Sequence, residues 1–248
     1  INFYQHVLSY SPEMKTFWRI DSLMECEYDK IRINYENVPF HGGKMKKVIF
    51  DVDGVLLSEE RYFDIAALTV WEILYSPKYM GMPAEKDNFI VGTVNEGRIA
   101  ECRKSVWGNG TLISWLKARG INSNWDMVHA ALITIFWIMA EVYSARSGGE
   151  KVAFRLESEK DVQETGKILM GIPVPSADKI LEKWEKTVPE GIYGEDVIHT
   201  LAAAMAPSFA NPDTWAELRS SFWKIHTSAF QEWYLGDDNY IRYLHKSP

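Results

Sequence analysis

Apolar residues recur at steps of three and four through most of the chain after residue 60, which predicts helices. In the first such run they are Phe63, Ala66, Ala67, Val70, Trp71 and Leu74, and Pro77 ends the run. The same spacing, with Ser, Asn, Gly and Pro at the boundaries, predicts further helices over 98–107, 111–119, 124–145, 158–169, 176–187, 195–205 and 213–235. Asn124 is the predicted cap of the longest helix.

A different pattern precedes these helices. Residues 30–40 alternate between apolar and polar positions, which predicts a half-buried strand, and His41-Gly-Gly43 predicts a turn. The short apolar run Val48-Ile-Phe50 then ends in an acid, as a strand buried on both faces of a parallel sheet does. We therefore expect an α/β fold that is mostly helical in this chain.

The composition is that of an ordinary folded protein, with 46% hydrophobic and 25% charged residues among 248. A formal net charge of -7 argues against a nucleic-acid-binding protein, which usually carries a basic face. The two cysteines, Cys26 and Cys102, are far apart, and we expect reduced thiols in a cytoplasmic protein. We expect no membrane span, because the longest apolar stretch, Ala130 to Ala140, is short.

Asp51 and Asp53 are the strongest candidates for chemistry. Two acids at positions i and i+2 of a strand point to the same face, and Gly54 permits a tight exit beside a ligand. Such a pair suits Mg²⁺, a hard cation that prefers oxygen ligands. It also suits phosphoryl transfer, in which one carboxylate attacks phosphorus and the other acts as general acid and base.

The segment Phe50-Asp-Val-Asp-Gly-Val-Leu56 resembles motif one of the haloacid dehalogenase superfamily, in its phosphatase branch. The resemblance covers the N-terminal portion only. It implies a Rossmann-like α/β core with an inserted helical cap, Asp51 as nucleophile, Asp53 as general acid/base, and Mg²⁺ on the Asp51 carboxylate and the Asp53 backbone carbonyl. A calcium-binding EF-hand loop is excluded, because Tyr62 stands where that loop needs its final Glu.

The resemblance gives a division of the chain. Met45 stands directly before the motif-one strand, so residues 1–44 are interpreted as an N-terminal extension with a strand at 30–40. Residues 45–59 are the expected first core strand and loop, residues 60–235 the helical cap, and residues 236–248 a return to the core or a tail.

The family's other motifs have no convincing counterpart. These are a strand ending in Ser or Thr, a Lys or Arg, and a further pair of acids. Gly236-Asp-Asp238 resembles the acidic motif superficially, but a helix end or loop is the preferred interpretation. We therefore expect part of a longer phosphatase acting on a small phosphorylated substrate, or a chain completed by a second polypeptide. The alternatives are a non-catalytic helical binding module that retains motif one, and a phosphomutase.

Other charged and aromatic residues are weaker candidates for function. Arg61, Arg103 and Lys104 are candidates for contact with a substrate anion, although solvated helix positions are the preferred interpretation. The histidines on helical stretches have no partner at metal-ligand spacing and are expected to be packed or on the surface: His129, His199 and His226. Four tryptophans are expected in the core of the helical region: Trp107, Trp115, Trp125 and Trp137.

Overall fold

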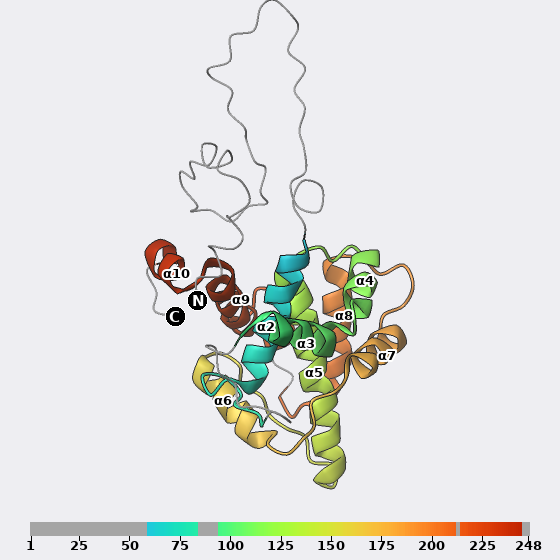
Figure 1. Cartoon of the computed structure of the whole chain (residues 1–248). Helices are drawn as coiled ribbons and strands as arrows, with labels where there is room; N and C mark the ends of the chain where they lie inside the picture. The colour runs from blue at the N-terminus through green and yellow to red at the C-terminus, as the bar shows by residue number, and fades with distance from the viewer. Residues whose placement is uncertain (1–58, 84–93, 212–213, 245–248) are drawn as a thin grey trace, which may run out of the picture. The chain divides into compact units, whose positions relative to one another are not determined.

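The computed structural model describes residues 59–83, 94–211 and 214–244, which belong to one compact unit that starts at Glu59 (Figure 1). These residues form α-helices joined by short loops and two 3₁₀ turns. The elements are α2 Glu60–Tyr75, α3 Glu96–Trp107, α4 Thr111–Ala118, α5 Asn124–Arg146, α6 Glu159–Ile168, α7 Ala177–Thr187, α8 Glu195–Met205, η3 Ala206–Ser208, η4 Thr214–Ala216, α9 Ser221–Leu235 and α10 Asp237–Leu244.

The expectation of an α/β fold is wrong. The described residues contain helices and no strand, so they hold no sheet and no Rossmann-like core, and their strand-like pairing amounts to an isolated bridge between Val152 and Phe209. The physical reason lies in the apolar spacing after Glu59, which has the helical period. The strands predicted at 30–40 and 48–50 lie outside the described residues.

Helix α5 is the centre of the unit. It contacts α2, α7, α8 and α9, and its residues from Asp126 to Trp137 are all buried (Figure 1). By length and composition alone, this helix of 23 residues could cross a membrane. However, 72% of its most apolar window is buried against other helices, which is typical of a central helix in a helical domain.

Aromatic rings fill the space beside α5. Phe136 of this helix lies against Phe154, Trp215 and Phe222, at centroid separations of 5.9, 6.1 and 5.3 Å. On another side, Trp184 donates a 2.7 Å hydrogen bond to the hydroxyl of Thr134, so that this buried indole is satisfied. Three of the four predicted core tryptophans, Trp107, Trp115 and Trp137, are buried, and Trp125 is half-buried.

Side chains before the helices explain where several of them begin. In four helices the N-cap side chain accepts a hydrogen bond from the backbone N–H three residues later, which satisfies one of the free donors of the first turn. These caps are Asn95, Ser123, Ser158 and Ser220. The cap of α5 is thus Ser123, one residue before the predicted Asn124.

The predicted helix over 213–235 is broken in two. Its described part begins with the short turn η4, and α9 starts only at Ser221. Between them Arg219 has φ +65°, a left-handed conformation that interrupts a helix at a non-glycine residue. Past Gly236, residues expected to form a loop or tail instead form α10, which packs against α9.

Candidate functional site

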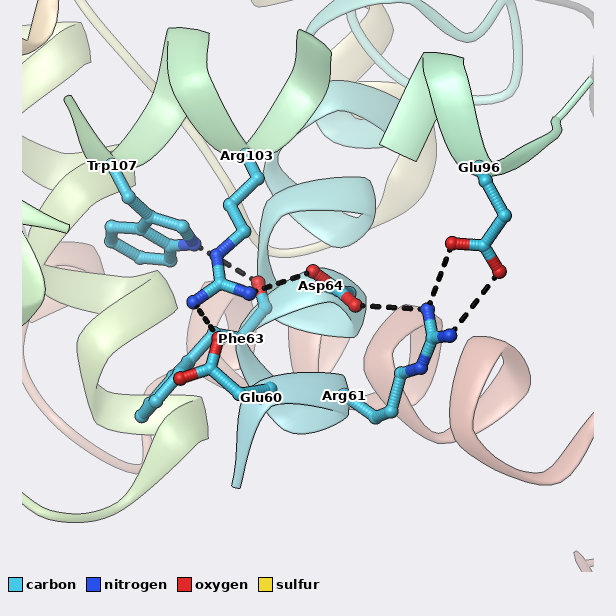
Figure 2. A network of polar contacts seen from close by, with 7 residues as sticks. All are labelled: Glu60, Arg61, Phe63, Asp64, Glu96, Arg103 and Trp107. Atoms are coloured by element: carbon cyan, nitrogen blue, oxygen red, sulfur yellow. Dashed lines mark hydrogen bonds and ion pairs between the residues drawn. The ribbon is translucent and has the colours of Figure 1, made fainter. Parts of the chain in front are cut away.

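The predicted catalytic acids Asp51 and Asp53 lie outside the described residues. The described structure opens just after them, because only Gly54 to Ser58 separate Asp53 from Glu59. The polar cluster at the start of α2 is therefore the described feature nearest in sequence to the candidate catalytic motif, and it is shown in Figure 2.

Asp64 is the centre of this cluster. Its side chain is 9% exposed and accepts hydrogen bonds from two guanidinium groups (Figure 2). Arg61, one turn earlier on α2, donates to Oδ2 at 3.2 Å, and Arg103 of α3 donates to Oδ1 at 3.2 Å. A buried carboxylate needs such partners, because removing an ion from water costs several kcal/mol unless charge and hydrogen bonds compensate.

An outer ring of acids holds the two arginines. Arg61 donates to both carboxylate oxygens of Glu96, at 3.1 and 3.2 Å, and this hydrogen bonding raises the pKa of Arg61. Arg103 forms an ion pair with Glu60. Acids and bases thus alternate in a row of contacts between α2 and α3, in the order Glu60, Arg103, Asp64, Arg61 and Glu96 (Figure 2).

Aromatic contacts also hold the start of α2. The indole N–H of Trp107 donates to the backbone carbonyl of Phe63 at 3.1 Å. The Phe63 ring lies beneath the guanidinium of Arg103 and the ammonium of Lys117, at 5.8 and 4.9 Å. Lys117 of α4 also forms an ion pair with Glu59. Helices α3 and α4 together therefore fix the first turns of α2.

The charges of the cluster suit anchoring better than anion binding. Its three cations face four carboxylates, so the group carries no excess positive charge with which to attract a phosphate: Arg61, Arg103 and Lys117 against Glu59, Glu60, Asp64 and Glu96. Arg61 and Arg103, considered from the sequence for contact with a substrate anion, are thus brought together by Asp64. Lys104 is exposed.

Replacing Asp64 with Asn is expected to lower the free energy of unfolding by about 2 kcal/mol, because the amide removes the charge between two guanidiniums and points a donor at one of them. Urea unfolding of the whole chain measures the effect. Glu101→Gln is the control. Glu101 pairs with Arg98 but is 68% exposed, and its replacement is expected to change stability by less than about 0.5 kcal/mol. Equal effects of the two variants would contradict the anchoring role.

A second ionisable group lies where α2 meets α9. Glu72 is 5% exposed and accepts a 2.8 Å hydrogen bond from the indole of Trp233. Burial, with the negative charge of Glu232 nearby, raises the pKa of Glu72 to about 7. Lys78 pairs with Glu232 at 3.2 Å. Glu72 is therefore an acid that exchanges its proton near neutrality inside a helix interface.

Two histidines that are isolated from each other in the sequence are in contact. Nδ1 of His129 lies 3.0 Å from Nε2 of His226, and both side chains are fully buried between α5 and α9. The third, His199, is exposed and pairs with Glu217 at 2.6 Å. The expectation of packed or surface histidines is confirmed, but their pairing was missed, because the two residues are 97 positions apart in the sequence.

Metal and ligand sites are not evident among the described residues. They contain no group of three or more His, Cys, Asp or Glu side chains that could hold a metal ion. Asp237 is exposed at the start of α10. Two surface hollows of about 420 and 370 Å³ lie elsewhere, one beside Ser144 and Lys151, the other beside Arg119 and Tyr193. Neither is lined by the Asp64 cluster or by the histidine pair.

Comparisons with known proteins give a structural likeness. No protein-family model and no curated protein matches the chain. One solved structure, the X-ray structure of Northeast Structural Genomics Consortium target ZR25, is similar to it, with a TM-score of 0.64 and 26% sequence identity. The match covers 82% of this chain and 52% of that one. The chain thus spans about half the length of a structure with a similar fold, whose name states no function.

Proposed function

We propose that this chain carries the nucleophile loop and a helical substrate-covering domain of a Mg²⁺-dependent phosphate-monoester hydrolase. The observation that carries the proposal is the sequence Asp51-Val-Asp-Gly54 after an apolar run, which resembles motif one of the haloacid dehalogenase superfamily. An acid at the second position fits the phosphatase branch. Phosphorylated small molecules are the proposed substrate class.

The proposed reaction has two steps on the two acids. A carboxylate oxygen of Asp51 attacks phosphorus, the bond from phosphorus to the ester oxygen breaks, and the Asp53 carboxyl gives its proton to the departing alcohol. Asp53, now a carboxylate, takes a proton from water, which attacks phosphorus and breaks its bond to Asp51. Phosphate leaves, and both acids return to their starting states.

The donor set suits the proposed cofactor. Carboxylate and carbonyl oxygens are the ligands that Mg²⁺ prefers, and the Asp51 carboxylate with the Asp53 carbonyl would supply two of them. When bound, the ion offsets the repulsion between an anionic nucleophile and an anionic phosphate. Further oxygen ligands are proposed to come from water, phosphate and acids elsewhere in the complete enzyme.

The helical domain has a proposed role in substrate selection. A domain that follows the nucleophile loop directly can cover the reacting groups, exclude water and contact the part of the substrate that varies. The Asp64 cluster supports this role, because it fixes the helix into which the loop leads. Precise placement of the groups that contact a substrate strongly affects rate, so a helix whose first turns are fixed by ion pairs suits a domain that contacts the substrate.

The remaining groups of the site are proposed to lie in a longer form of this protein or in a second polypeptide. They are a Ser or Thr that binds phosphate, a Lys or Arg that neutralises it, and the further metal-binding acids. The likeness to a solved structure of which this chain covers 52% supports this proposal, since the rest of such a chain has room for them.

The test is hydrolysis of p-nitrophenyl phosphate by this chain and by the longest product of its gene. Each is assayed after removal of metal with EDTA and again after addition of MgCl₂. We expect turnover that requires Mg²⁺ in the longer product. We expect none in this chain alone, because the remaining groups of the site are proposed to lie outside it. Activity that is absent from both at every Mg²⁺ concentration contradicts the proposal.

That negative outcome favours a second candidate, a non-catalytic helical binding module that retains motif one. A specific observation supports it: in the part of the chain that the structure describes, the charged cluster nearest in sequence to Asp53 holds acids and bases already paired with each other. A phosphomutase would use the same two acids. Transfer of phosphate to a second hydroxyl of the substrate, without release of inorganic phosphate, identifies that activity.

A further inference from the structure

The buried histidine pair joins three parts of the helical unit. His129 is on α5, His226 is on α9, and neither side chain has exposed surface. Nε2 of His129 lies 2.8 Å from the backbone carbonyl oxygen of Ala216, the last residue of η4. Nδ1 of His129 lies 3.0 Å from Nε2 of His226. A single row of polar atoms therefore runs from η4 through α5 to α9.

The carbonyl fixes the position of every proton in this row. A carbonyl oxygen only accepts, so Nε2 of His129 must carry the proton that it donates. In a neutral imidazole the other nitrogen, Nδ1, is then an acceptor, and Nε2 of His226 must donate to it. Nδ1 of His226 is left without a proton, and this buried atom has no hydrogen-bond partner.

No additional proton fits the row. If His129 gained a proton on Nδ1, Nε2 of His226 could accept from it only if His226 moved its own proton to Nδ1, where the N–H would be buried with no acceptor beside a buried imidazolium. A proton on Nδ1 of His226 would create a buried imidazolium with no acceptor, among the rings of Phe222 and Trp223. Burying an unpaired charge is strongly unfavourable, so the contact requires both rings to be neutral.

The charged groups facing the pair do not relieve this cost. Asp126 of α5 is committed to the Trp223 indole at 2.9 Å and to Arg219 at 3.4 Å. Arg219, in the loop before α9, is itself a cation and opposes a second positive charge on His129. The other charged and titratable groups contact the C-terminal half of α9. Glu72 of α2 and Lys78 of the following loop contact Trp233 and Glu232, and Tyr240 of α10 is hydrogen-bonded to Ser228.

We propose that the His129–His226 pair is a proton-sensitive latch, which holds α9 and the attached α10 against α5 while both rings are neutral and releases them under mildly acidic conditions.

The sign follows from the two states. Burial lowers the pKa of His129 to about 4, and burial together with His129 lowers the pKa of His226 well below its ordinary value. In the released state both rings return to a pKa of about 6.5, so that state binds more protons below pH 6.5. The contribution of the latch is therefore complete above about pH 6.5 and is lost as the pH falls toward 4.

Glu72 of α2, which contacts Trp233 of α9, changes the docking of α9 with pH in the opposite sense. Its pKa is raised from 4.5 to about 7 when it is buried, so the docked state binds the extra proton, and docking weakens as the pH rises from 4.5 to 7. The two effects overlap in pH. The latch must therefore be tested by comparing variants at the histidines while Glu72 is left unchanged.

The experiment is hydrogen–deuterium exchange of the full chain at pH 7 and pH 5, read on peptides from α9 and α10 and corrected for intrinsic exchange. His226→Gln keeps a donor for His129 but cannot titrate, and His199→Gln, at an exposed histidine, is the matched control. From pH 7 to pH 5, the opening constant of α9 is expected to rise about 30-fold more in the wild-type chain and in His199→Gln than in His226→Gln. An equal rise in all three overturns the proposal.

A second measurement covers the case in which His226→Gln is unfolded at pH 7. Imidazole NMR signals of the wild-type chain report the protonation of each ring while amide exchange reports the docking of α9. We expect both buried rings to stay neutral for as long as α9 remains protected. A buried ring that gains its proton near pH 6.5 while α9 is still protected overturns the latch.

Discussion

Replacing Asp51 with Asn in the longest product of the gene is expected to lower its Mg²⁺-dependent turnover of an aryl phosphate by at least about 10³-fold, because an amide has no anionic oxygen to attack phosphorus. The effect should fall on kcat, since the covalent step itself is removed.

Asp53→Asn should behave differently. It retains the nucleophile, so it can form the aspartyl-phosphate with a good leaving group but hydrolyses it slowly. Labelled phosphate should therefore accumulate on Asp53→Asn and stay absent from Asp51→Asn.

The control for both variants is Asp237→Asn. This acid also lies in an Asp pair of the sequence, but it is exposed at the start of α10, so its loss should leave turnover within about twofold of wild type. Asp51→Asn with turnover equal to that of the control would contradict the proposed nucleophile. Loss of turnover in all three would point to a general effect on folding and not to the chemistry of Asp51.

The helices could be predicted because each carries its own boundaries. Helix α2 ends at Tyr75 because Ser76, before Pro77, is extended, as a residue before proline usually is. Helix α3 ends at Gly108, whose φ of +56° suits glycine, and a side chain there would meet Ala177 at 2.9 Å. These signals are local, so a single sequence contains them.

The fold class could not be predicted in the same way. It was inferred from two short segments before residue 58, outside the described residues, whereas the described elements are helical. The break at Arg219 was missed for a related reason. Its left-handed backbone is accompanied by ion pairs with Asp126 and Glu195, which come from distant parts of the chain. Local propensity gives no warning of a conformation held by tertiary contacts.

The candidate sites left a weaker trace in the sequence. Asp64 and Glu72 are acids within an otherwise apolar stretch of α2, and an acid there is a signal of a buried ion pair or a shifted pKa. Their partners, Arg103 and Trp233, could not be named, because pairing across 39 and 161 residues depends on how the helices pack. The same holds for His129 and His226.

The close approach of α6 to the loop after α2 depends on a single glycine. Gly166 lies inside α6, and a Cβ built on it would stand 1.9 Å from the carbonyl oxygen of Met80 and 2.7 Å from its Cα. Met80 cannot simply move, because its own N–H donates to Ile73 at 3.1 Å. On the same helix, Gln163 donates to two carbonyls of this loop, those of Pro77 and Lys78, at 3.2 Å each.

Gly166→Ala is therefore expected to lower the free energy of unfolding by about 3 kcal/mol, since the methyl group meets backbone and must push α6 off the loop. This sign is opposite to the usual one, because alanine in a helix interior is favoured over glycine by about 1 kcal/mol. Urea unfolding gives the size of the effect. Exchange of the α6 amides shows whether this helix has separated, since its opening should rise well before that of α5.

Gly97→Ala supplies the matched comparison. Gly97 is also helical, in the first turn of α3, but it is exposed, and its Cβ would meet nothing closer than the Asn95 side chain at 3.3 Å. This variant is expected to be neutral or more stable by up to about 1 kcal/mol. If Gly166→Ala were equally stable, α6 would not be docked through its glycine, and the contact with Met80 would be no constraint on the fold. Opposite signs at the two positions establish that backbone proximity, and not helix propensity, decides the residue at 166.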